Sequence, residues 1–417
     1  MTTSPLFQPL TLPNGVVLKN RIAKAAMEEN LADGEHAPGG KLRRLYKTWA
    51  AGGAGLIITG NVMVDAAAMT GHGGVVVEDR EHLHALRKWA KAGRGHGARM
   101  LMQINHPGRQ MRAALGQQTI APSAPPLEFG QCSGYFSPPR EMTDRDIQEV
   151  IARFVETAGI AEDAGFGGVE IHAAHGHLLN QFLSPLTNRR TDQWGGALDN
   201  RARPLVEITR RIRKLVARDF CVAVKINSAD FQPGGFDIDD AMRVVGILND
   251  LDVDLIDISG GNFESPAMQG RVADGRTLAR EADFLEFAKE IRTVAKMPIM
   301  LTGGIRDKAA AEKVIGEGVS IAGMATALAF SPDLPHYWAK GEPEGVVAPG
   351  VQWKNMSLAA LAARAVTDDQ LQRLGRGKAP KRHIRPAMAL VRAQARSARS
   401  ARKYARWFSK RAEKGGE

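Results

Sequence analysis

The chain has 417 residues, of which 44% are hydrophobic and 24% charged, as in globular proteins, and this composition excludes wholesale disorder. No run approaches the roughly 18 consecutive apolar residues of a membrane span. The opening residues, MTTSPLFQPLTLPNG, lack the basic region and apolar run of a secretory signal, so we expect a cytoplasmic protein. Two cysteines, Cys132 and Cys221, exclude a disulfide framework and a four-cysteine metal or iron–sulfur site.

Positive charge is concentrated at one end of the chain. From Arg376 to Glu417 there are fourteen Lys/Arg and two Asp/Glu, a net of +12, whereas the whole chain carries +11. The first 375 residues therefore have a net charge of about −1. A neutral body argues against an enzyme that acts on nucleic acid, and the basic tail needs an explanation of its own.

The body alternates short apolar segments with longer amphipathic ones. The expected strands are 21–27, 55–60, 99–105, 168–172, 221–227, 254–259, 298–302 and 319–323. The expected helices are 41–51, 80–94, 144–164, 200–216, 239–251, 283–295, 308–316 and a short one after Pro332. Eight strands, each followed by a helix, predict an α/β fold, the (β/α)8 TIM barrel.

Two additions to the barrel are expected. Asn14-Gly15 lies between short apolar runs and predicts an N-terminal hairpin that plugs the barrel floor. We expect residues 1–345 to form the barrel domain and residues 346–417 a helical, basic extension. Long loops at 106–142 and after His172 follow strands, where a barrel keeps its active site. A disordered insertion is the alternative for the first, Pro-rich loop.

Histidines cluster just after the fourth expected strand, in the segment EIHAAHGHLLNQ. His172 is at the strand end and His175 follows three residues later. Two imidazoles there can donate hydrogen bonds to a carbonyl or nitro oxygen and stabilise developing charge. On spacing alone, a metal site with His177 as third ligand weighs about equally, and histidines satisfied in the core are a further alternative.

Five collinear segments resemble the Old Yellow Enzyme family of FMN-dependent ene-reductases, in its bacterial branch. They are LKNRIAKAAM (18–27), LMQINHPGRQ (101–110), the histidine segment with its continuation FLSPLTNRRTDQWGG, MLTGGI (300–305) and GMATALAFSP (323–332). The resemblance spans about residues 5 to 340. It implies that NAD(P)H gives hydride to N5 of FMN, which passes it to the β-carbon of an activated alkene, an α,β-unsaturated carbonyl or nitro compound. It also implies that His172 and His175 hold the substrate oxygen and bind no metal.

The resemblance assigns further residues to the cofactor. Gln103 matches the amide at the flavin's pyrimidine edge, and Lys225 matches the cation beside N1, where charge on the reduced ring is stabilised. A buried ion pair with a neighbouring carboxylate is the alternative for Lys225. Ala25, Ala26 and Met27 match the strand backbone beside the ring, and Gly60 matches a position where a side chain would collide with the ring. The residues that match the phosphate site are Gly303, Gly304, Gly323 and Ala325.

Three positions depart from the family pattern. His177 replaces the proton-donating tyrosine, so His177 is the proton source, or water is, or ordinary enone reduction is not favoured. Thr326 stands where an arginine commonly grips the phosphate. Glu28 occupies the position of a redox-tuning cysteine, where a carboxylate would disfavour the reduced anion unless it faces substrate or solvent.

Because of these departures from the family pattern, two other functions remain as alternatives. The first is a flavin-dependent desaturase or dehydrogenase that passes electrons to oxygen or another acceptor. The second is a catalytically weakened barrel that acts as a binding protein.

Several polar residues after the histidines are predicted to be structural. We expect Asp199 or Asn200 to cap the following helix. The residues expected to hold the loop beneath the histidines are Asn188, Arg189, Asp192, Trp194 and Arg201.

The tail predicts a helix over 386–412 with a basic face. Its basic residues recur at three- and four-residue steps: Arg392, Arg396, Arg399, Lys403, Arg406 and Lys410. An anionic membrane, an acidic partner or nucleic acid without sequence specificity would each fit such a face. The plainer alternative is a helix that docks on its own barrel or on a second copy of the chain.

Overall fold

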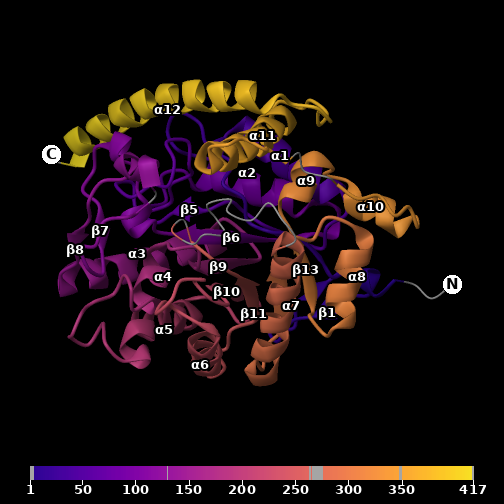
Figure 1. Cartoon of the computed structure of the whole chain (residues 1–417), viewed down its shortest axis with the longest axis horizontal. Coiled ribbons are helices and arrows are strands. Elements are labelled where there is room, and N and C mark those ends of the chain that lie inside the picture. Colours follow the sequence, from indigo (N-terminus) through magenta and orange to yellow (C-terminus); the bar gives the residue numbers. More distant parts are fainter. Residues whose placement is uncertain (1–3, 129, 263, 265–275, 347–349, 416–417) are drawn as a thin grey trace.

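Eight parallel strands close into a barrel in the computed structural model, which describes residues 4–415 apart from 129, 263, 265–275 and 347–349 (Figure 1). In barrel order the strands are β3 (Ile22–Lys24), β4 (Leu56–Ile58), β6 (Arg99–Asn105), β9 (Gly168–Ala173), β10 (Cys221–Asn227), β11 (Leu255–Ser259), β12 (Ile299–Thr302) and β13 (Ile321–Met324). Each pairs in parallel with the next, and β13 pairs with β3. The predicted TIM barrel is confirmed.

Helices surround the barrel, most of them close to their predicted positions, but two short ones at 178–183 and 326–330 were not predicted and the helix predicted at 283 begins at Arg276. They are α1 (Gly40–Ala51), α2 (Leu83–Gly93), α3 (Asp144–Asp163), α4 (Leu178–Leu183), α5 (Leu198–Leu215), α6 (Ile238–Leu248), α7 (Arg276–Val294), α8 (Lys308–Gly316), α9 (Thr326–Phe330) and α10 (Leu334–Ala339). The expected cap of α5 is wrong, because Ala197 is its N-cap and makes no side-chain bond. The helix begins early enough to place Asp199 and Asn200 inside its first turn.

Residues alternate along each strand, so every second side chain points into the barrel. Near the strand beginnings these side chains are apolar and pack with Leu12 and Leu18 of the N-terminal hairpin, formed by β1 (Leu10–Thr11) and β2 (Val17–Leu18). The floor includes Ala23, Leu56, Leu101, Cys221, Ala223, Leu255, Met300 and Ile321. The hairpin therefore closes the bottom of the barrel with apolar side chains.

The inner surface becomes polar two residues further along several strands. Gln103 follows Leu101 in this alternation, Lys225 follows Ala223, and Asp257 follows Leu255. All three side chains are buried. Polar groups thus gather at the carboxyl ends of the strands, the end of a barrel that carries active sites.

The outer wall holds a second buried lysine. Lys24 of β3 is fully buried against α1, with its Nζ 2.8 Å from the carbonyl oxygen of Ile58 and 4.4 Å from the ring centre of Trp49. Nζ also lies 3.3 Å from the Tyr46 hydroxyl and 3.5 Å from a carboxylate oxygen of Glu29. Burial lowers the pKa of Lys24 to about 8, although Glu29 opposes that shift.

The described part of the loop after β6 contains short elements. They are η3 (Gly108–Gln110), η4 (Ala113–Leu115), β7 (Ile120–Ala121), η5 (Gly130–Tyr135) and β8 (Arg140–Glu141). β7 pairs with β8, and Met111 and Leu115 are buried. A disordered insertion does not describe this part of the loop. A further short strand, β5 (Val62–Met63), pairs with the end of β6.

The C-terminal extension folds back on the barrel as two helices, α11 (Met356–Gly375) and α12 (Pro386–Gly415), seen together along the top of Figure 1. Tyr404 and Trp407 are buried among apolar residues that include Met63 and Met111. The Tyr404 hydroxyl donates to the carbonyl of Ala66 at 2.9 Å. Docking on its own barrel is therefore the arrangement of the described extension. No helix in the described ranges is both long and apolar enough to cross a membrane.

Candidate active site

Three histidines meet at the carboxyl end of β9. The ring centres of His172 and His175 are 5.2 Å apart, and those of His172 and His177 are 4.5 Å apart. His175 has a positive φ of 59°, and this turn of the backbone brings the rings of His172 and His177 close together. The structure thus brings together all three histidines that the sequence singled out.

Neighbouring strand ends hold two of these rings. Nε2 of His175 lies 2.7 Å from the Ser259 hydroxyl at the end of β11. The backbone N–H of His175 donates to Asn227 Oδ1 at the end of β10, at 3.1 Å. Nδ1 of His177 lies 2.7 Å from Oδ1 of Asn105 at the end of β6. Side chains from three strands therefore fix the histidines over the barrel mouth.

Burial sets the charge of the first two histidines. It lowers the pKa of His172 and His175 well below the ordinary histidine value, so both are neutral near pH 7. Nδ1 of His172 accepts a hydrogen bond from the backbone N–H of Ala174 at 3.3 Å. A neutral imidazole that accepts at Nδ1 carries its proton on Nε2, so His172 can donate that proton in a hydrogen bond.

His177 has the opposite tautomer. Because Asn105 presents an oxygen, Nδ1 of His177 donates to it, and Nε2 of the neutral ring is left as an acceptor. Burial lowers the pKa of His177 to about 4, with nearby Glu28 opposing the shift. His177 gives up a proton from Nε2 only after it has first become charged.

A layer of coupled polar side chains lies inside the barrel. Lys225 forms an ion pair with Asp257, which faces it across the β10–β11 register and accepts from the Thr302 hydroxyl at 2.6 Å. Nε2 of Gln103 donates to Glu170 at 2.7 Å. Burial, with repulsion from Asp257, raises the pKa of Glu170 to about 8. Lys225 therefore forms the buried ion pair with a neighbouring carboxylate that the sequence analysis gave as an alternative to a role beside the flavin.

The predicted flavin positions lie at the ends of neighbouring strands. Ala25, with Ala26, Met27 and Glu28 behind it, directly follows β3, and the Ala25 amide donates to the carbonyl of Met324 at 2.9 Å. A Cβ at Gly60 would lie 2.1 Å from the carbonyl oxygen of Met27, so backbone packing already requires glycine there.

The predicted phosphate positions follow β12 and β13. Gly303 and Gly304 have positive φ values of 150° and 68°, conformations that favour glycine. A Cβ at Gly323 would lie 2.4 Å from the Thr302 hydroxyl, so close strand packing also requires this glycine. Ala325 is the N-cap of α9, and Thr326 is its first residue.

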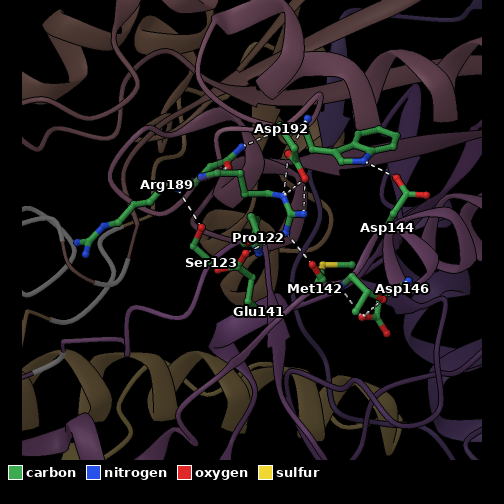
Figure 2. Close-up of polar contacts among 12 residues, drawn as sticks. Pro122, Ser123, Glu141, Met142, Asp144, Asp146, Arg189 and Asp192 are labelled. Atoms are coloured by element: carbon green, nitrogen blue, oxygen red, sulfur yellow. Dashed lines mark hydrogen bonds and ion pairs between the residues drawn. The ribbon is translucent and has the colours of Figure 1, made fainter.

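The segment after the histidines is anchored by polar bonds (Figure 2). Arg190 pairs with Asp192 at 2.5 Å and donates to the carbonyls of Pro122 and Met142 at 3.1 and 2.6 Å. The Arg189 amide donates to the Ser123 hydroxyl at 3.0 Å. These bonds join the loops after β6 and β9. Asn188, Trp194 and Arg201 are also held by hydrogen bonds, to Phe182, Asp144 and Leu183.

Both the sequence and the fold resemble those of known proteins. Residues 5–344 match the NADH:flavin oxidoreductase / NADH oxidase family. The chain belongs to that family. It is 36% identical to the NADH-dependent flavin oxidoreductase iliE of Hypocrea jecorina over 78% of this chain and 87% of the relative. It is 39% identical to iliE of Neonectria sp. over 79% of this chain, but that match spans only 46% of the relative. The Old Yellow Enzyme homologue of Zymomonas mobilis has the same fold, with a TM-score of 0.68 and 24% identity over 82% of this chain and 94% of that one.

As a member of this family, the protein is an oxidoreductase of the Old Yellow Enzyme type that uses FMN and takes electrons from NAD(P)H. The groups at the mouth fit that cofactor. An isoalloxazine ring needs hydrogen-bond partners and a cation at its pyrimidine edge, and Gln103 and Lys225 supply these chemistries from β6 and β10. A phosphate needs backbone amides, and Gly303 and Gly304 have no side chains of their own that would cover theirs. Within the described residues, no three His, Cys, Asp or Glu side chains are grouped as metal ligands.

Several residues that shape this candidate site were missed from the sequence. Asn105, Asn227 and Ser259 each end a strand, and polar residues at strand ends are a signal that could have found them. Asp257, buried opposite Lys225, follows from strand alternation once the register is known. Arg364 of α11, which forms an ion pair with Glu28, had no local signal, because 336 residues separate the two.

Proposed function

We propose that this enzyme reduces activated alkenes, either α,β-unsaturated carbonyl or nitro compounds, with NAD(P)H as reductant. The observation that carries the proposal is the pair of neutral imidazoles held above the mouth, with the His172 proton directed to Nε2 by the Ala174 amide. Neutral donors can bind an uncharged carbonyl or nitro oxygen and stabilise the charge that builds on it. His172 and His175 are the proposed substrate-binding pair.

The remaining predicted residues receive cofactor roles in this proposal. FMN, when bound, supplies the hydride that the alkene accepts. Lys225 and Gln103 would hold its pyrimidine edge, and Asp257 keeps the Lys225 ammonium in place. The backbone from Ala25 to Glu28 and the space at Gly60 would lie beside the ring. The phosphate would bind at Gly303, Gly304, Gly323, Ala325 and Thr326, with backbone amides and a hydroxyl in place of an arginine.

Proton delivery is assigned to His177, with water as the alternative donor. The ring is within reach of the substrate-binding pair, since its centre is 4.5 Å from that of His172. Its neutral form is an acceptor at Nε2, so it must take up a proton before each delivery. Alkene reduction should therefore become faster in acid if His177 is the donor.

The test is the double variant His172→Ala with His175→Ala. We expect the purified protein to stay yellow and to oxidise NADH, while reduction of a cyclic enone and a nitroalkene falls to background. Retained colour shows that the variant is folded. Unchanged enone turnover would defeat the assignment. Oxygen uptake on a saturated ketone, with no alkene reduction by wild type, would instead favour a desaturase.

The extension, residues 346–417, carries a separate proposal: its outer face contacts an anionic lipid surface. The inner face of α12 is taken up by the barrel, while the basic residues exposed on the opposite side are Arg399, Arg402, Lys403, Arg406 and Lys410. Vesicles with anionic lipid should sediment the wild-type protein at low salt, and neutral vesicles should not. Reversal of three of these charges should abolish sedimentation. Equal binding of wild type and that variant would contradict the proposal, and self-association would point to a second copy as partner.

A further inference from the structure

The C-terminal extension reaches the edge of the candidate active site through one side chain. Arg364 of α11 forms an ion pair with Glu28, which lies four residues beyond the end of β3. The same carboxylate accepts a hydrogen bond from the Thr70 hydroxyl at 3.0 Å. Glu28 is therefore bound by Thr70 of the barrel domain and by Arg364 of the extension.

The surroundings of Glu28 keep it ionised. Burial alone would raise its pKa, but Arg364 and Arg112 outweigh that effect and hold it at about 2. Arg112, on the loop after β6, also lies 3.4 Å from the Ser397 hydroxyl of α12. Arg364 and Arg112 thus offset the charge of the largely buried Glu28, and both also act on a second carboxylate, Asp368, whose pKa burial raises to about 6. Arg364 and Asp368 belong to the extension.

Glu28 is electrostatically coupled to the histidine cluster. The pKa of His177 is raised by Glu28 and lowered by His106 and Arg364, in addition to the larger effect of burial. Asn105 and His172 are the other polar groups packed against the His177 ring. Without Arg364, Arg112 would be the remaining arginine that offsets Glu28, and the carboxylate would act more strongly on His177 and on any reduced ring beside β3.

We propose that the extension completes the active site, with Arg364 as a positioning residue that fixes and neutralises Glu28 beside the flavin. This inference rests on the proposed placement of FMN over the barrel mouth. A carboxylate at that place would work against a reduced anionic ring, and Arg364 removes the penalty by pairing with it. The same pairing limits how far Glu28 raises the pKa of His177, and so sets the pH range in which His177 takes up the proton that it delivers.

The test compares Arg364→Gln, Arg364→Lys and the double variant Arg364→Gln with Glu28→Gln, all as holoenzymes. We expect the midpoint potential of bound FMN to become more negative in Arg364→Gln. It should stay near wild type in Arg364→Lys and return toward wild type in the double variant. NMR titration of histidine-labelled oxidised enzyme should show a higher His177 pKa in Arg364→Gln alone.

Arg392→Gln is the matched control, because Arg392 pairs with Asp369 inside the extension, at 3.0 Å, instead of with Glu28. Its potential should equal that of wild type. An unchanged potential in Arg364→Gln, no recovery in the double variant, or an equal shift in Arg392→Gln would each overturn the inference. Failure of wild type to reduce alkenes would refute the proposed substrate class but leave this comparison of potentials intact.

Discussion

Two buried lysines differ in what they serve. Lys225 lies on the inner wall of the barrel, at the candidate active site, and Lys24 lies on the outer wall, within the core of the fold. Both pair with a buried carboxylate, Asp257 in one case and Glu29 in the other. Lys225 belongs to a polar layer that opens at the mouth, whereas Lys24 is enclosed by the aromatic rings of α1. A buried charge by itself therefore does not mark an active site. The direction in which its strand position points decides whether it serves chemistry or the fold.

The largest expected effect comes from Lys225→Met. Loss of a cation beside the flavin should lower enone turnover by about 10²–10³-fold, the scale of losing one preorganised electrostatic partner. The measurement is kcat for NADH-driven enone reduction, corrected for bound FMN. A variant with full turnover would place the flavin away from Lys225.

Lys24→Met should act on stability instead. Removal of one partner from a buried pair typically costs about 3 kcal/mol, because Glu29 is left without its cation. We expect a lower urea midpoint together with unchanged turnover per bound FMN at low temperature. If Lys24→Met reduces kcat as strongly as Lys225→Met does, the distinction between the two walls fails.

The pH dependence of alkene reduction tests His177. Burial lowers its pKa to about 4, so its protonated fraction should rise roughly tenfold for each unit of pH decrease from 7 to 5. With His177 as donor, the rate of alkene reduction by pre-reduced enzyme rises by about 100-fold over that range. In His177→Asn this acid activation should be absent. A flat profile in wild type would assign the proton to water.

The smallest effect is expected at the partly exposed ion pairs that join the end of α12 to the barrel. Arg411 of α12 pairs with Glu78 at 2.5 Å and Asp79 at 2.6 Å, and all three side chains are partly exposed. Arg411→Gln should cost less than about 1 kcal/mol in unfolding free energy. Alkene turnover should not change. A large loss of turnover would mean that the extension controls the site through more than Arg364 of α11.

Much of the fold could be predicted because periodicity is a local property. The strands β6 and β10 begin and end at the predicted residues, and α8 does as well. His172 and its two neighbours were predicted as a cluster, since strand ends and short spacings bring them together. Their roles as ligands of substrate and proton remain predictions.

Tautomers, registers and contacts across long sequence distances could not be predicted in this way. The proton position on His177 depends on Asn105, which comes from a different strand. The pairing of Lys225 depends on the register of β10 and β11, and that of Glu28 on a helix 336 residues away. Lys24 was passed over because nothing in the sequence AKAAM distinguishes an outward lysine from an inward one.

The most direct test of the account is a crystal structure with FMN and a substrate-like phenol or enone bound. We predict that the ring lies across the mouth, with Gln103 and Lys225 at its pyrimidine edge, and that the ligand oxygen contacts His172 and His175. A flavin bound elsewhere, or a ligand that leaves both imidazoles untouched, would contradict the account.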